Sequence, residues 1–136
     1  AMIYGPLDRI LGTRKWIVVI GSAVTAACFL ALGLLELPLV PATMVMAALG
    51  AFGMTYGVLM AHGRSFFPDH LLGRGLTLMN VLFLGGAGLL QPLSGALMKG
   101  WVAENPATAY ASLHVIFGVL LFASLAVYLV ARDRPA

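Results

Sequence analysis

The chain has 136 residues, of which 61% are hydrophobic and only 10% are charged, and its mean hydropathy is +0.99. Soluble domains carry about 25% charged residues, so this composition excludes an ordinary soluble domain and indicates an integral membrane protein. The net charge of +3 does not indicate nucleic-acid binding, because the few cations stand at the ends of apolar runs, where orientation signals of membrane proteins belong.

Residues 1–15 form a charged segment that we expect to be a cytoplasmic loop. It holds three cations and one acid, Asp8, with Gly and Pro between them, directly before a long uncharged run. Ala1 precedes Met2, which fits a segment cut from a longer chain as well as a cloning scar. The cations can anchor a membrane helix, but this role does not explain Asp8.

Four apolar runs follow, and each is long enough to cross a bilayer, whose core of roughly 30 Å needs about 20 helical residues. We predict an all-α membrane protein, because no long stretch alternates with a period of two as membrane β-strands do. The four predicted helices cover residues 16–35, 42–61, 76–98 and 110–131, and a tail follows at 132–136. Cys28 lies alone inside the first run, so no disulfide between two cysteines of the chain can form.

The distribution of cations predicts the orientation of the chain. One side carries Arg9, Arg14, Lys15, Arg64, Arg74, Arg132 and Arg134, and the other side carries Lys99 alone. The positive-inside rule therefore places both termini and the joint between the second and third helices in the cytoplasm. We expect a multi-pass protein of the cytoplasmic (inner) membrane of a bacterium.

The charged segment YGPLDRILGTRK resembles the cytoplasmic signature of major facilitator superfamily (MFS) transporters, which is close to G-x-x-x-D-R-x-G-R-R/K. The matching residues, in type and order, are Gly5, Asp8, Arg9, Gly12, Arg14 and Lys15. The spacing departs by one residue on each side of Asp8, and Thr13 intervenes, which favours the degenerate copy found between the eighth and ninth helices of the family.

Two further stretches extend the resemblance over nearly all of the chain. FFPDHLLGRGLTLMN looks like the usual approach to the eleventh helix of the family, and LGGAGLLQPLSGAL looks like that helix itself. The resemblance implies that the four predicted helices correspond to helices nine to twelve of a twelve-helix MFS fold. Hydropathy alone predicts only four helices with both ends inside.

Polar residues inside the predicted spans are candidates for a substrate path, because polar groups are costly in hydrocarbon. Asn80 and Gln91 are eleven residues apart, which at about 100° per residue leaves only about 20° between them on a helix. Thr55 and Tyr56 lie in the cytoplasmic half of the second helix. Helix packing explains all four as well as a substrate path does, and the eleventh helix of the family lines the cavity. His114, near the outer end, is interpreted as an interfacial structural histidine.

Glycines in the second and third predicted helices indicate close helix packing, since small residues let membrane helices approach. Gly53 and Gly57 have the small-xxx-small spacing. The set that we expect to pack the two helices together is Gly50, Gly53, Gly57, Gly85 and Gly88.

The cations of the cytoplasmic side are also candidates for a latch. The family resemblance implies a contact between Asp8 and an arginine such as Arg64 when the inner gate is closed. The proposed latch residues are Asp8, Arg9, Arg14, Lys15, Arg64 and Arg74. The simpler interpretation is that these charges only set the topology, because exposed ion pairs contribute about 0–1 kcal/mol.

The sequence shows no metal-ligand cluster, nucleophile constellation or phosphate loop, and no charged residue at the middle of a span. We therefore expect no enzyme activity and no cofactor. The favoured function is the C-terminal part of a secondary transporter that moves a small solute by alternating access. Its expected partners are the lipid bilayer, the preceding helices of the same transporter and a solute that the sequence does not identify. The alternative is a free-standing four-helix membrane protein with a structural or assembly role.

Overall fold

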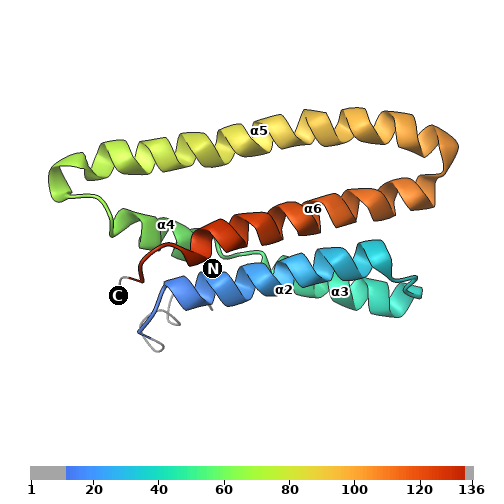
Figure 1. The fold of residues 1–136 in the computed structure, drawn as a ribbon, viewed down its shortest axis with the longest axis horizontal. Helices are drawn as coiled ribbons and strands as arrows, with labels where there is room; N and C mark the ends of the chain where they lie inside the picture. Colours follow the sequence, from blue (N-terminus) through green and yellow to red (C-terminus); the bar gives the residue numbers. More distant parts are fainter. Residues whose placement is uncertain (1–11, 134–136) are drawn as a thin grey trace.

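A computed structural model describes residues 12–133, and every ordered element in this range is helical (Figure 1). The elements are α2 (Lys15–Leu34), α3 (Leu39–Phe52), α4 (Tyr56–Arg64), the short 3₁₀ helix η1 (Asp69–Leu71), α5 (Leu72–Glu104) and α6 (Pro106–Leu129).

Four segments of the structure are long and apolar enough to cross a membrane, which confirms the prediction of an all-helical chain with four apolar helices of that length. The first and fourth are α2 and α6, the second is α3 together with α4, and the third is α5 with η1. The largest difference from the predicted bounds is in α5, which has 33 residues instead of the stretch 76–98. At 1.5 Å per residue it is about 50 Å long, so it extends beyond the hydrocarbon core or crosses it at a tilt.

The helices lie roughly antiparallel along one axis, with α2 between α3 and α6, and α5 running along α6 (Figure 1). The start of α2, the end of α4, the start of α5 and the end of α6 lie toward one end of the molecule (Figure 1). We call this end the cation-rich end, because Lys15, Arg64, Arg74 and Arg132 belong to it. Its assignment to the cytoplasmic side stays a prediction.

The most extensive helix contact is between α2 and α6, and two glycines lie in it. A Cβ on Gly33 would lie 2.7 Å from the carbonyl oxygen of Ala111 and 2.9 Å from the backbone nitrogen of Val115. A Cβ on Gly118 would lie 2.7 Å from a methyl group of Leu30. Small residues thus let the two backbones approach, as is common between membrane helices.

The local sequence explains why the connection between α5 and α6 is so short. Asn105 is extended, and its side-chain oxygen accepts hydrogen bonds from the backbone nitrogens of Ala107 and Thr108. Pro106 occupies the first position of α6, where a missing N–H leaves no helical bond unmade. This capping turns the chain back at once, so α6 runs antiparallel to α5.

The second span is not the continuous helix that the sequence predicts over residues 42–61. It is interrupted between Phe52 and Tyr56 by a turn at residues 53–55. The turn packs on α2 at Gly21, where a Cβ would collide with the methyl group of Thr55 and lie 3.4 Å from the carbonyl oxygen of Phe52. Hydropathy does not distinguish this arrangement from an unbroken helix, because both bury the same apolar residues in the bilayer.

The predicted glycine contact between the second and third spans is not found in the described part of the chain. A Cβ on Gly50, Gly57, Gly85 or Gly88 would have no neighbour within 4 Å, and one on Gly53 would meet only the Leu49 backbone of its own helix. The predicted contact is not made because α3 packs on α2 and not closely on α5. The glycines that lie against another helix are Gly21 and Gly33 on α2, Gly118 on α6 and Gly63 on α4, which meets the Met79 side chain of α5.

We predict that Gly33→Ala destabilises the protein by about 1–3 kcal/mol, because the added methyl group would press on backbone atoms that cannot move aside. The measurement is unfolding of the purified chain in mild detergent by titration with a denaturing detergent. Gly88→Ala is the matched control, since its added methyl group meets open space. Equal stability of the two variants would contradict the close α2–α6 contact.

Candidate functional site

Two sequence-predicted polar residues, Tyr56 and Asn80, meet beside the break in the second span, whereas the side chain of Thr55 lies against Gly21 of α2. Tyr56 begins α4 directly after Thr55, and its hydroxyl donates a hydrogen bond of 2.5 Å to the side-chain oxygen of Asn80 on α5. The Tyr56 ring also lies against the ring of Phe83, with 4.4 Å between the ring centroids. The structure therefore joins α4 to α5 through one polar and one aromatic contact beside the turn.

The turn at residues 53–55 lies within the second apolar segment, between α3 and α4. Gly53 and Thr55 keep right-handed helical dihedral angles, and the Gly53 N–H donates to the carbonyl oxygen of Leu49, as in a helix. On one side the turn is covered by α2 at Gly21. On the other side Gly53, Met54 and Tyr56 are exposed in the described chain.

Gln91 lies beside a cavity of about 560 Å³ between α2, α5 and α6. The other residues that line it are Phe29, Ala87, Leu90, Ser94, Phe117, Leu120, Leu121 and Ser124. The hydroxyls of Ser94 and Ser124 are already bonded to carbonyl oxygens of their own helices. The Gln91 carboxamide makes no hydrogen bond to any residue from 12 to 133, so it is the polar group that this cavity offers to a ligand or to water.

Asn80 and Gln91 lie on the side of α5 that faces the other helices. Asn80 bonds to α4, and Gln91 lines the cavity that α5 shares with α2 and α6. The opposite side of α5 carries Leu82 and Leu89, each 67% exposed. The two carboxamides of α5 thus lie on the side toward the protein, among apolar residues such as Phe83 and Leu90, over a length of about three turns. We call this side the polar side of α5.

A buried cluster at the cation-rich end was not predicted from the sequence. His62 on α4 is only 1% exposed. Its Nε2 lies 3.1 Å from the carbonyl oxygen of Arg132, and its Nδ1 lies 2.5 Å from the hydroxyl of Tyr128. A carbonyl oxygen only accepts, so Nε2 carries the proton and the Tyr128 hydroxyl donates to Nδ1. This arrangement ties the end of α4 to the end of α6.

The signal that could have revealed His62 is the length of the second helix. The predicted helix ends at residue 61, which makes His62 a loop residue, whereas α4 continues to Arg64. One further helical turn rotates His62 toward Val58, which is also buried and packs with Ile17 and Val18 of α2.

The proposed latch residues fall partly outside the described structure. Asp8 and Arg9 lie outside residues 12–133, so their contact with Arg64 stays a prediction. Lys15 donates a hydrogen bond of 2.8 Å to the carbonyl oxygen of Leu129 at the end of α6, where a cation is favoured by the helix dipole. Arg14 precedes α2, and the side chains of Arg64 and Arg74 are exposed at the ends of α4 and α5.

A second bond joins the same two chain segments, because the Thr13 hydroxyl donates to Asp133 at 2.7 Å. In the described residues the cation-rich end is therefore held by Lys15, Thr13 and His62. Each of these bonds ends on residues 128–133, at or just beyond the end of α6.

No group of three potential metal-ligating side chains occurs in residues 12–133. Comparison of the chain with known protein families, with curated proteins and with solved structures found no match. The function must therefore be inferred from the geometry of the broken second span and of the polar side of α5.

We predict that Tyr128→Phe lowers the stability of the protein by about 1–3 kcal/mol, because it leaves Nδ1 of the buried His62 without a donor. Thermal unfolding of the purified chain measures the loss. Tyr110→Phe is the matched control on the same helix, since the Tyr110 ring is exposed. If both substitutions have the same small effect, the His62–Tyr128 bond does not hold α4 to α6.

Proposed function

We propose that the chain is the C-terminal part of a secondary transporter that moves a small solute across the membrane by alternating access. The observation that carries the proposal is the polar side of α5, which faces a broken helix and a cavity at membrane depth. Asn80 and Tyr56 lie at the break, and Gln91 lies at the cavity.

The energetic argument rests on the Gln91 carboxamide. An amide group in hydrocarbon without a partner costs several kcal/mol, whereas the same group in a wetted path loses little hydration. Asn80 already has a partner in Tyr56, so it fits either helix packing or a substrate path. Gln91 has no protein partner among the described residues, which favours water or a solute as its partner.

The broken second span supports the same function. Transporters often build their substrate sites from interrupted helices, whose free backbone groups meet the solute near the middle of the bilayer. The interruption at residues 53–55 lies within the second span, and Tyr56 follows it directly. The resemblance to the MFS assigns this span to the tenth helix of the family and α5 to the eleventh, and this numbering is part of the proposal.

Two of the four spans leave large apolar surfaces uncovered. No residue of α3 is buried, and the most apolar stretch of α5 contains no buried residue. Within the proposal, these surfaces contact lipid and the preceding helices of the transporter.

The same uncovered surfaces favour a second candidate function, a membrane protein that assembles with copies of itself. The two functions differ in what covers α5. A stable oligomer of the chain in detergent, with the polar side of α5 at its interface, would favour assembly.

We predict that cysteines at positions 80 and 91 react with a membrane-impermeant thiol reagent in intact membranes that contain the complete transporter. The background is Cys28→Ala, which removes the single native cysteine. Both side chains should be labelled several-fold faster than matched cysteines on the other side of α5.

The matched controls are Leu82→Cys and Leu89→Cys, which lie about 160–200° around the helix from both test positions and are exposed toward the surroundings. Addition of a transported solute should slow labelling at positions 80 and 91 only. Protection of both test positions in every condition would remove the basis for a substrate path.

A further inference from the structure

The cavity beside Gln91 is bordered by two helix sides with the same residue spacing. The lining residues are Ala87, Leu90, Gln91 and Ser94 on α5, and Phe117, Leu120, Leu121 and Ser124 on α6, with Phe29 of α2 between them. Both sets follow the spacing i, i+3, i+4, i+7, which places each set on one side of its helix. The two helices therefore each turn one side toward a common space of about 560 Å³.

The lining of this cavity is mainly apolar, and among the described residues it contains no charged side chain and no histidine. The rings of Phe29 and Phe117 meet edge to face, with 5.8 Å between their centroids. The lining residues belong to the middle parts of α5 and α6. An ion would be costly at this depth, because no opposite charge in the lining compensates for its lost water. The cavity therefore suits an uncharged molecule with an apolar body.

The Gln91 carboxamide presents hydrogen-bond donors and an acceptor on one planar group. It carries two N–H donors and a carbonyl oxygen, and none of them is bonded to any residue from 12 to 133. The hydroxyls of Ser94 and Ser124 donate to carbonyl oxygens of their own helices, so they offer only acceptors. A molecule that carries an N–H donor beside a carbonyl oxygen can pair with Gln91 through two parallel hydrogen bonds.

We propose that this cavity binds an uncharged aromatic lactam, with its amide edge paired to the Gln91 carboxamide and its rings in the apolar part of the cavity. A lactam ring holds the N–H and the carbonyl on the same side. An open-chain secondary amide is almost always trans, so its two groups point in opposite directions and only one can reach Gln91.

The size and the apolar lining of the cavity fit such a ligand. Sites for small molecules have volumes of about 300–1,000 Å³ and a few polar groups in a mostly apolar lining. Aromatic rings of the ligand can add edge-to-face contacts with phenylalanine side chains. If the proposed function holds, on which this last step rests, aromatic lactams are the class of the transported solute.

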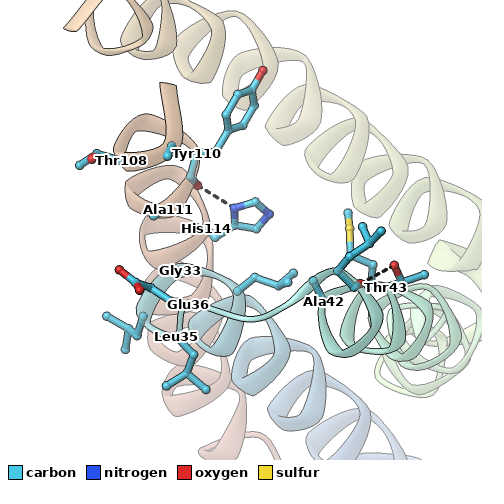
Figure 2. A pocket seen from close by; sticks show the side chains of 14 residues that line it. Gly33, Leu35, Glu36, Ala42, Thr43, Thr108, Tyr110, Ala111 and His114 are labelled. Atoms are coloured by element: carbon cyan, nitrogen blue, oxygen red, sulfur yellow. Dashed lines mark hydrogen bonds between the residues drawn. The ribbon is translucent and has the colours of Figure 1, made fainter. Parts of the chain in front are cut away.

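The second cavity of the chain lacks this combination of groups. Its volume is about 680 Å³, and it lies at the end opposite to the cation-rich end, between α2, α3 and α6. Figure 2 shows that His114 and Thr43 in this cavity are each bonded to a carbonyl oxygen of their own helix. Glu36 adds an acid to the lining, and no carboxamide occurs among its described residues. An aromatic lactam should therefore bind beside Gln91 and not in the second cavity.

The experiment uses the full chain, labelled with nitrogen-15, in phosphatidylcholine nanodiscs. Gln91 is the single glutamine of the sequence, so selective labelling identifies its side-chain amide signal. Quinolin-2-one is titrated in, and we expect a saturable downfield shift of the Gln91 side-chain protons, because one of them enters a hydrogen bond. The backbone signals of Thr43 and His114, in the second cavity, should not move. Absence of a saturable shift at Gln91 would overturn the proposal.

Three compounds of similar size separate the contributions to binding. N-methylquinolin-2-one lacks the N–H donor, naphthalene lacks both polar groups, and quinoline-2-carboxylate is charged. Each should displace quinolin-2-one at least fivefold less effectively, when concentrations in the lipid phase are equal. Equal displacement by any of the three would overturn the proposal, and for naphthalene it would show that the cavity takes any apolar occupant, such as a lipid chain.

The matched pair of variants is Ala87→Phe and Ala96→Phe. Both alanines are exposed on α5, but nine residues place them about 180° apart around the helix, and only Ala87 lines the cavity. The first variant should weaken quinolin-2-one binding at least fivefold by filling the cavity, and the second should leave it unchanged. Equal affinity of the two variants would contradict binding in this cavity.

This test and the thiol-labelling test can fail separately. If positions 80 and 91 are labelled but quinolin-2-one does not shift the Gln91 signal, the substrate path stands and the proposed class of ligand is wrong. If quinolin-2-one binds but both positions are protected in every condition, the ligand site stands and the transport function loses its basis.

Discussion

The contact between α2 and α6 is the interaction on which the rest of the fold depends. It contains Gly33 and Gly118, where an added Cβ would collide with the neighbouring helix, and the fully buried Ala26. In lipid no hydrophobic force drives helices together, so the fit of small residues and interhelical bonds must hold them. The other two spans pack on this pair. The second span, formed by α3 and α4, packs on α2, and the third span, α5, packs on α6.

The bonds at the cation-rich end reinforce the same pair. Lys15 ties α2 to the end of α6, and His62 ties α4 to the same segment. The α2–α6 pair and the end of α4 form the best-packed part of the structure, whereas α3 and most of α5 bury little surface against the other helices.

The fold class could be predicted from the sequence because hydropathy and length decide whether a helix can cross a bilayer. The break at residues 53–55 could not, since a glycine in an apolar run fits both a packed helix and an interrupted one. For the same reason Gly53 and Gly57 were assigned to packing, while Gly33 and Gly118, which do pack, have no spacing that singles them out. Their role depends on which helix lies opposite, and that is a tertiary property.

The candidate site residues could likewise be predicted from the sequence only in part. The helical period predicts that Asn80 and Gln91 share a side of α5, and no periodicity indicates that Tyr56 is the partner of Asn80. His62 was missed because an error of one turn at a helix end changed a buried residue into a loop residue. Helix ends are set by capping and by contacts with neighbours, which hydropathy does not contain.

The central claim is that water reaches the side of α5 that carries Asn80 and Gln91. Water-to-amide magnetisation transfer, measured residue by residue in lipid nanodiscs, tests it most directly. We expect strong transfer at the side-chain amides of Asn80 and Gln91 and little transfer at the backbone amide of Ala26, in the middle of α2. Side-chain amides of Asn80 and Gln91 that are as well shielded from water as Ala26 would contradict the account.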